Sequence, residues 1–91
     1  MKDIAKKAVE KWGIESQIKM AIEEMAELTV ALNHYERGKA TLEDVASEIA
    51  DVKIMMEQLE YIVNQATGSE LVKEQERYKL ERLEKVINGA D

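Results

Sequence analysis

The sequence predicts an all-α protein that folds as a helical bundle, and three observations lead to that prediction. The chain of 91 residues has no proline and is rich in Glu, Ala, Lys and Leu, which are strong helix formers. Apolar residues recur with helical spacing along most of its length. Each apolar pattern stops at a glycine, as is typical of helix C-termini, and these glycines are Gly13, Gly38, Gly68 and Gly89. We therefore expect one domain, residues 1–91, with four helical segments.

The first two segments differ in length and in the width of their apolar side. The first is short, from about Asp3 to Trp12, and its apolar side consists of Ile4, Ala8 and Val9. The second runs from about Ile14 to Arg37, and its apolar residues recur in alternating steps of four and three. They are Ile14, Ile18, Ala21, Met25, Leu28, Leu32 and Tyr35. This heptad-like spacing predicts a helix with one packing stripe.

The third and fourth segments also read as helices. The third starts at the N-cap residue Thr41, has Glu43 and Asp44 in its first turn, and reaches about Ala66. Its stripe is Leu42, Val45, Ile49, Val52, Met56, Leu59 and Val63. The fourth runs from about Ser69 to Asn88, with a thinner stripe of Val72, Leu80, Leu83 and Val86 or Ile87. Acidic and basic side chains interleave there, so we expect most of this last helix to face solvent.

Charge and composition exclude several classes of function. Acidic residues outnumber basic residues by 19 to 13, and the resulting net charge of −6 repels nucleic-acid backbones and anionic lipid. We therefore expect no nucleic-acid partner. The sequence has no apolar run of membrane-spanning length and no signal-like start, so we expect no membrane partner and a cytoplasmic location. A small domain without cysteine has no disulfide to stabilise it, so we expect a homo-oligomer.

Two acidic pairs lie on the middle helices. Glu24 and Glu27 are spaced i, i+3, as are Glu48 and Asp51, so each pair projects from one helix face. The connection at residues 38–40 is short, which predicts an antiparallel hairpin. Counted from that turn at about 1.5 Å per residue, the two pairs lie level within one helical turn. We expect four carboxylates to gather between the helices.

Such a cluster is stable if some of its members stay protonated or if a divalent cation binds. An all-oxygen donor set favours a hard ion, Mg²⁺ or alternatively Mn²⁺. Any i, i+3 acidic pair can also be a solvated helix face, and for Glu23 we prefer that interpretation. Glu27 fits both interpretations equally. Glu48 lies within the apolar sector of its helix, where an unpartnered acid is costly, so the functional interpretation is favoured there.

These residues carry a resemblance to a known family. The pattern Glu-Glu-x-x-Glu is followed about 20 residues later by Glu-x-x-Asp, with Trp12, Gly13 and Gln17 ahead and Val52 behind. Over roughly residues 12–59 it resembles the MazG-like family of all-α nucleoside triphosphate pyrophosphohydrolases. The resemblance implies a bundle assembled as a homodimer or homotetramer. It also implies a reaction that splits a nucleoside triphosphate into a monophosphate and pyrophosphate.

The resemblance also implies roles for individual residues. It implies that the metal ligands are Glu24, Glu27, Glu48 and Asp51. A water activated by the metal would attack the α phosphorus, and we place the catalytic groups at Glu27 and Glu48, with Glu27 as the first choice of general base because it should be the least desolvated.

Contacts to the substrate are assigned to other side chains. For the triphosphate, the cationic candidates are Lys53, Lys73, Lys79 and Arg82. A solvated helix face explains Lys79 and Arg82 equally well. For the nucleobase we choose Gln17, whose amide donates and accepts, together with Trp12. Trp12 is alternatively an anchor for the first helix. We place His34 on the surface, on the far side of its helix from the carboxylates.

Two other classes of function compete with the enzyme. One is a non-enzymatic helical dimerisation or adaptor module, which explains the apolar stripes and the acidity but not Glu48 in an apolar sector. The other is a degenerate relative that binds metal or nucleotide without turnover. It would carry the same ligands, so the sequence does not distinguish it from the enzyme.

Overall fold

The structure is a computed structural model that describes residues 2–89, and in that range it contains four helices and no strand. The helices are α1 (Lys2–Trp12), α2 (Ile14–Glu36), α3 (Leu42–Thr67) and α4 (Leu71–Ile87). The all-α prediction is confirmed, and each helix begins and ends within two residues of its predicted bound. No helix within residues 2–89 is both long and apolar enough to cross a membrane.

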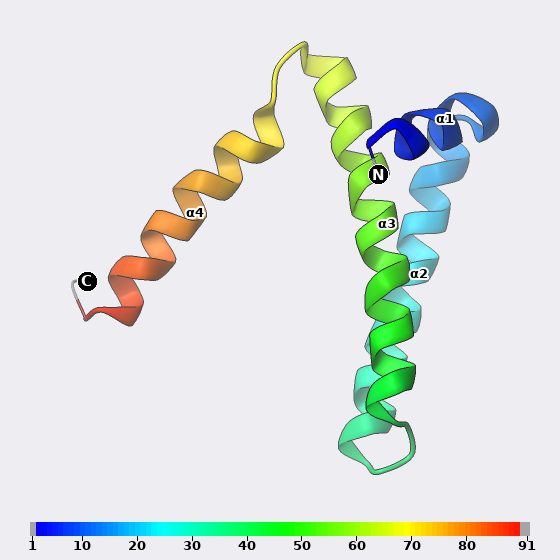
Figure 1. The fold of residues 1–91 in the computed structure, drawn as a ribbon, viewed down its shortest axis with the longest axis vertical. Coiled ribbons are helices and arrows are strands. Elements are labelled where there is room, and N and C mark those ends of the chain that lie inside the picture. Colours follow the sequence, from blue (N-terminus) through cyan, green and yellow to red (C-terminus); the bar gives the residue numbers. More distant parts are fainter. Residues whose placement is uncertain (1, 90–91) are drawn as a thin grey trace.

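Helices α2 and α3 form the predicted antiparallel hairpin (Figure 1). At the end of α2 the backbone N–H of Lys39 donates to the carbonyl of His34 at 2.7 Å. The next helix then starts from a capping box. The Thr41 hydroxyl accepts from the Asp44 N–H at 3.1 Å, and the Asp44 carboxylate accepts from the Thr41 N–H at 2.9 Å. The predicted N-cap at Thr41 is therefore confirmed.

Helix α1 packs across the end of the hairpin that lies away from this turn (Figure 1). Gly13 has a φ of 92°, which allows the chain to reverse direction between α1 and α2. The buried residues of all three helices meet beneath α1 and along the seam of the hairpin. They are Ala5, Ala8, Val9, Gln17, Ala21, Val45, Met55 and Gln58. This small core fixes the register of α2 against α3.

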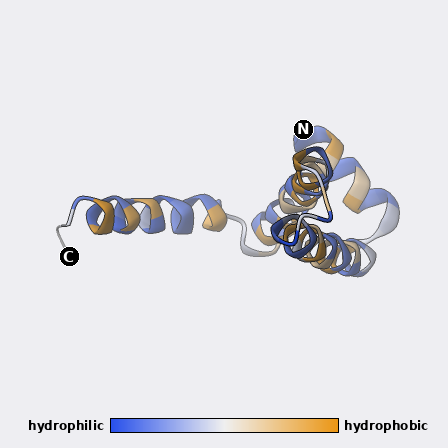
Figure 2. Ribbon diagram, turned by 90° about the horizontal axis from the view of Figure 1, so that it is seen from below, coloured by the Kyte–Doolittle hydropathy of each residue, from blue (hydrophilic) through white to orange (hydrophobic). Residues whose placement is uncertain are grey.

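Helix α4 lies apart from the hairpin. The chain leaves α3 through Gly68, which is left-handed with φ 68°, and α4 then extends away from the bundle (Figure 1). None of its residues is buried. Blue and orange bands alternate along α4 in Figure 2, and its apolar residues Leu80, Leu83, Val86 and Ile87 are exposed. The expectation that most of this segment faces solvent is confirmed.

The apolar stripe predicted for α2 is covered much less than its spacing suggests. Only Ala21 of that stripe is buried, and Leu28 is half-buried. The others are exposed, namely Ile14, Ile18, Met25, Leu32 and Tyr35. The reason is that a single facing helix covers a narrow seam, and the fourth helix does not return to cover the rest.

Candidate metal centre

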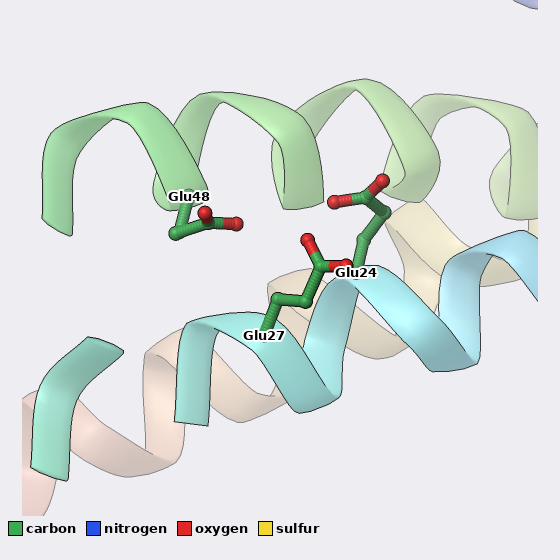
Figure 3. A group of neighbouring side chains, drawn as sticks. All are labelled: Glu24, Glu27 and Glu48. Carbon is green, nitrogen blue, oxygen red and sulfur yellow. The ribbon is translucent and has the colours of Figure 1, made fainter. Parts of the chain in front are cut away.

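Three carboxylates converge between α2 and α3. Glu24 and Glu27 project from α2 and Glu48 from α3, and the three side chains point toward one another across the gap (Figure 3). Each offers one carboxylate oxygen such that the three oxygens lie within 4.8 Å of one another. Oxygens at this spacing can share one cation, because a small divalent ion binds carboxylates at roughly 2.0–2.6 Å from each oxygen.

The local sequence explains this convergence. Glu24 and Glu27 are one helical turn apart, so they emerge from the same face of α2. The short turn and the Thr41 cap set where α3 begins, which brings Glu48 level with them. Glu24 and Glu48 are half-buried, whereas Glu27 is exposed. Glu27 therefore forms the open side of the cluster.

Burial and mutual repulsion make the cluster costly in its fully ionised form. Desolvation raises the pKa of Glu24, and the negative charges of Glu27 and Asp51 raise that pKa further. The pKa of Glu48 is raised by the same causes in the same order. In both Glu24 and Glu48, Oε2 is buried and accepts no hydrogen bond from any residue between 2 and 89. A buried carboxylate oxygen needs a proton, a donor or a cation.

Asp51 lies at the edge of this cluster. It is half-buried and close enough for its charge to raise the pKa of Glu24 and of Glu48, but it is not part of the group whose oxygens lie within 4.8 Å. Of the four predicted ligands, the structure thus brings three together and leaves the fourth beside them. Their role as metal ligands stays a prediction.

The two residues predicted to contact the nucleobase differ in their exposure. Gln17 is 5% exposed and belongs to the core, which leaves almost none of its amide accessible. Trp12 is 58% exposed, and the Lys11 ammonium lies 5.6 Å from its ring centroid. Trp12 lines a surface hollow with Met20 and Glu23, and none of the three clustered carboxylates lines that hollow.

The cationic candidates do not reach the carboxylates within this chain. Lys53 is exposed and follows Glu48 by five residues, so it lies about 140° around α3 from that side chain. Lys73 is at the start of α4, where its ammonium pairs with Glu70 at 3.5 Å. Lys79 and Arg82 are farther along α4, which extends away from the hairpin (Figure 1).

The structure reveals a groove that the sequence analysis missed. The groove follows the hairpin from Glu27 and Glu48 toward the turn, where His34 and Lys39 line it, and its volume is about 530 Å³. The expectation that His34 lies on the far side of α2 from the carboxylates is therefore wrong. His34 follows Glu27 by seven residues, which is two helical turns, so both project on the same side. That spacing was the signal that could have found it.

Comparisons with protein-family models, with curated proteins and with solved structures found no match to this chain. The resemblance to MazG-like pyrophosphohydrolases is therefore carried only by the spacing of the carboxylates and by the few residues that flank them. It stays a prediction. The chemistry of the site must be argued from the residues themselves.

Proposed function

We propose that the protein is a Mg²⁺-dependent nucleoside triphosphate pyrophosphohydrolase. The observation that supports it is the group of Glu24, Glu27 and Glu48. They come from two helices and include two buried carboxylate oxygens with no donor among residues 2–89. An all-oxygen donor set of this kind fits Mg²⁺ or Mn²⁺ better than softer metals. The resemblance in sequence supplies the reaction class.

The acidic residues would have different roles in the reaction. Glu24, Glu27, Glu48 and the adjacent Asp51 would hold the ion, which when bound neutralises phosphate charge and polarises water. Glu27 is the exposed member of the cluster and so the one best able to accept a proton from an attacking water. Attack at the α phosphorus breaks its bond to the bridging oxygen, and pyrophosphate leaves. Glu24 and Glu48 are oriented by their half-buried positions.

We further propose that the protein works as a homo-oligomer. Apolar side chains stay exposed on both α2 and α4, among them Ile22 at 58% and Leu80 at 59%. A second copy that covers these faces would remove them from water. It would also provide a way for Lys79 and Arg82 to approach carboxylates that they do not reach in their own chain. Sedimentation of a stable monomer at micromolar concentration would contradict this assembly.

The decisive experiment measures pyrophosphate release from the common ribonucleoside and deoxyribonucleoside triphosphates, with Mg²⁺ and with EDTA. We expect a nucleoside monophosphate and pyrophosphate as products in Mg²⁺ alone. Nucleoside diphosphate with inorganic phosphate would contradict attack at the α phosphorus, even if the metal site proved real.

A second measurement tests the metal independently of turnover. A ligand that binds only the folded state stabilises it, so Mg²⁺ should raise the melting temperature. Glu48→Gln should abolish that rise and leave the helix content unchanged. Glu84→Gln, which removes a charge from α4, is the matched control and should keep the rise. A metal response without turnover would identify a degenerate relative, and neither response would favour an adaptor built on the exposed apolar faces.

A further inference from the structure

The groove between the carboxylates and the hairpin turn has the size of a small-molecule site. Its volume of about 530 Å³ falls within the roughly 300–1,000 Å³ that is usual for ligand pockets. Glu27 and Glu48 line one end, and His34 and Lys39 line the other. From Glu27 to His34 the helix rises about 10 Å. A nucleoside monophosphate, measured from its phosphate to the far edge of its base, is about this long.

The walls of the groove suit a flat ring better than a phosphate chain. Val30 and Ala31 lie between its two ends, and Ala26 and Ala40 add small apolar side chains beside Glu27 and Lys39. They offer no donor to phosphate oxygens, but they can contact the face of a base. The groove also contains the carboxylate of Asp44, which is bonded to the Thr41 backbone. Away from the metal end the groove carries one carboxylate, Asp44, and one ammonium, Lys39, so no excess positive charge attracts an anion there.

The turn end of the groove carries few polar groups, and one of them can only donate. The Lys39 ammonium has three N–H donors and no acceptor, whereas His34 can do both. The Asp44 carboxylate only accepts, and its Oδ2 is already engaged by the Thr41 N–H. An ammonium at the edge of a base therefore favours an exocyclic carbonyl oxygen and disfavours an amino group at the same ring carbon. This asymmetry distinguishes uracil from cytosine and hypoxanthine from adenine.

We propose that this groove binds the nucleoside part of the substrate and that Lys39 selects bases with a carbonyl oxygen at their edge. The proposal rests on the proposed function, which places the phosphates at the carboxylates. The geometry that carries it is the continuity of one groove from Glu27 and Glu48 to His34 and Lys39. His34 positions the ring, and Lys39 determines specificity.

The test measures equilibrium binding of nucleoside monophosphates to the full chain in Mg²⁺ by calorimetry, with the pairs UMP and CMP and then IMP and AMP. In each pair one ring carbon bears a carbonyl oxygen or an amino group, and the adjacent ring nitrogen is correspondingly an N–H donor or an acceptor. We expect the carbonyl member to bind about tenfold tighter, as a charge-assisted hydrogen bond allows. Lys39→Met should reduce the affinity for the carbonyl member to that for the amino member, and it should leave the affinity for the amino member unchanged. Lys7→Met, on the exposed side of α1, is the matched control and should change neither.

The variants keep the fold, because the Lys39 side chain is exposed and its backbone bond to His34 does not depend on it. His34→Ala should weaken both members of each pair equally. Equal weakening of both members by Lys39→Met would assign that side chain to phosphate and overturn the proposal, as would equal affinity for the two members or no binding of any monophosphate. Because the assay needs no turnover, selective binding without pyrophosphate release would reject the proposed reaction and keep the groove. Pyrophosphate release in which Lys39→Met leaves the affinities for all four monophosphates unchanged would keep the proposed reaction and reject the role of the groove.

Discussion

The α2–α3 hairpin and α4 are built from similar residues and end in very different surroundings. The hairpin contains five of the eight buried residues and the entire carboxylate cluster, and α1 supplies the other three. Helix α4, with 17 residues, has none. An isolated helix of that length is marginal in water, because packing supplies most helix stability in proteins. The difference indicates that the hairpin and α1 share the buried core of the described residues, whereas α4 adds no buried residue to it.

The largest expected effect separates the carboxylates of the hairpin from those of α4. Asp51→Asn removes a charge beside Glu24 and Glu48 and should lower turnover about 100-fold or more, because charge neutralisation matters most in the transition state. Glu84→Gln makes the same chemical change on α4 and should have no effect on the initial rate. Steady-state pyrophosphate release measures both. Equal loss in the two variants would show that the acidic residues act only through overall charge.

The next effect concerns stability and compares a buried with an exposed apolar residue. Met55 is 5% exposed on α3, and Met55→Ala should lower the free energy of unfolding by about 2–4 kcal/mol because it leaves a cavity. Leu80→Ala on α4, where Leu80 is 59% exposed, should change it by less than about 0.5 kcal/mol at a concentration where the chain is monomeric. Urea unfolding measures both values. A large effect of Leu80→Ala under those conditions would mean that α4 packs within its own chain.

The helices themselves could be predicted from the sequence because their signals are local. Glycines mark their ends, and the cap formed by Thr41 and Asp44 lies within four residues of chain. The placement of α4 could not be predicted in this way. An apolar stripe such as that of Leu80 and Leu83 shows that a helix has a side to bury, but not which surface covers it.

In the candidate site, too, the features set by local spacing could be predicted and those set by tertiary packing could not. The sequence was sufficient to predict that three carboxylates lie close together, because helical spacing and a short turn fix their register. These are Glu24, Glu27 and Glu48. Gln17 could not be placed, because its burial depends on how α1 crosses the hairpin, which no local pattern specifies. His34 could have been found from its spacing to Glu27.

A smaller effect is expected from pH in the absence of metal. The pKa values of Glu24 and Glu48 are raised above the ordinary value of 4.5, so between 4.5 and the raised pKa the folded protein holds more protons than the unfolded chain. Stability should therefore fall as the pH rises through that window. Glu48→Gln should reduce the fall, whereas Glu84→Gln on α4 should not. Unfolding in EDTA at about pH 5 and about pH 7 tests this. A stability that rises across the window equally in wild type and Glu48→Gln would contradict it.

The smallest effect tests the start of α3. Thr41→Ala removes the hydroxyl that accepts from the Asp44 N–H and should cost about 1 kcal/mol of stability. Thr67→Ala, near the end of the same helix, should cost less. It removes an exposed hydroxyl that donates back to the Val63 carbonyl and accepts from the Ser69 hydroxyl, and neither bond satisfies a free N–H at the helix start. Thermal unfolding of the two variants gives the comparison. Equal costs would show that the cap does not contribute to the position of α3.

The connection that contains the left-handed Gly68 determines the direction in which α4 extends from α3. Helix α4 is about 25 Å long, so a rotation of about 20° at its base moves its far end by about 9 Å. The conformation of the connection at residues 68–70 therefore sets how far Lys79 and Arg82 stand from the hairpin. A side chain at position 68 would have to occupy a φ of 68°, which L residues adopt at a cost of about 1–2 kcal/mol. The reach of Lys79 and Arg82 thus depends on a connection in which Gly68 holds a left-handed conformation.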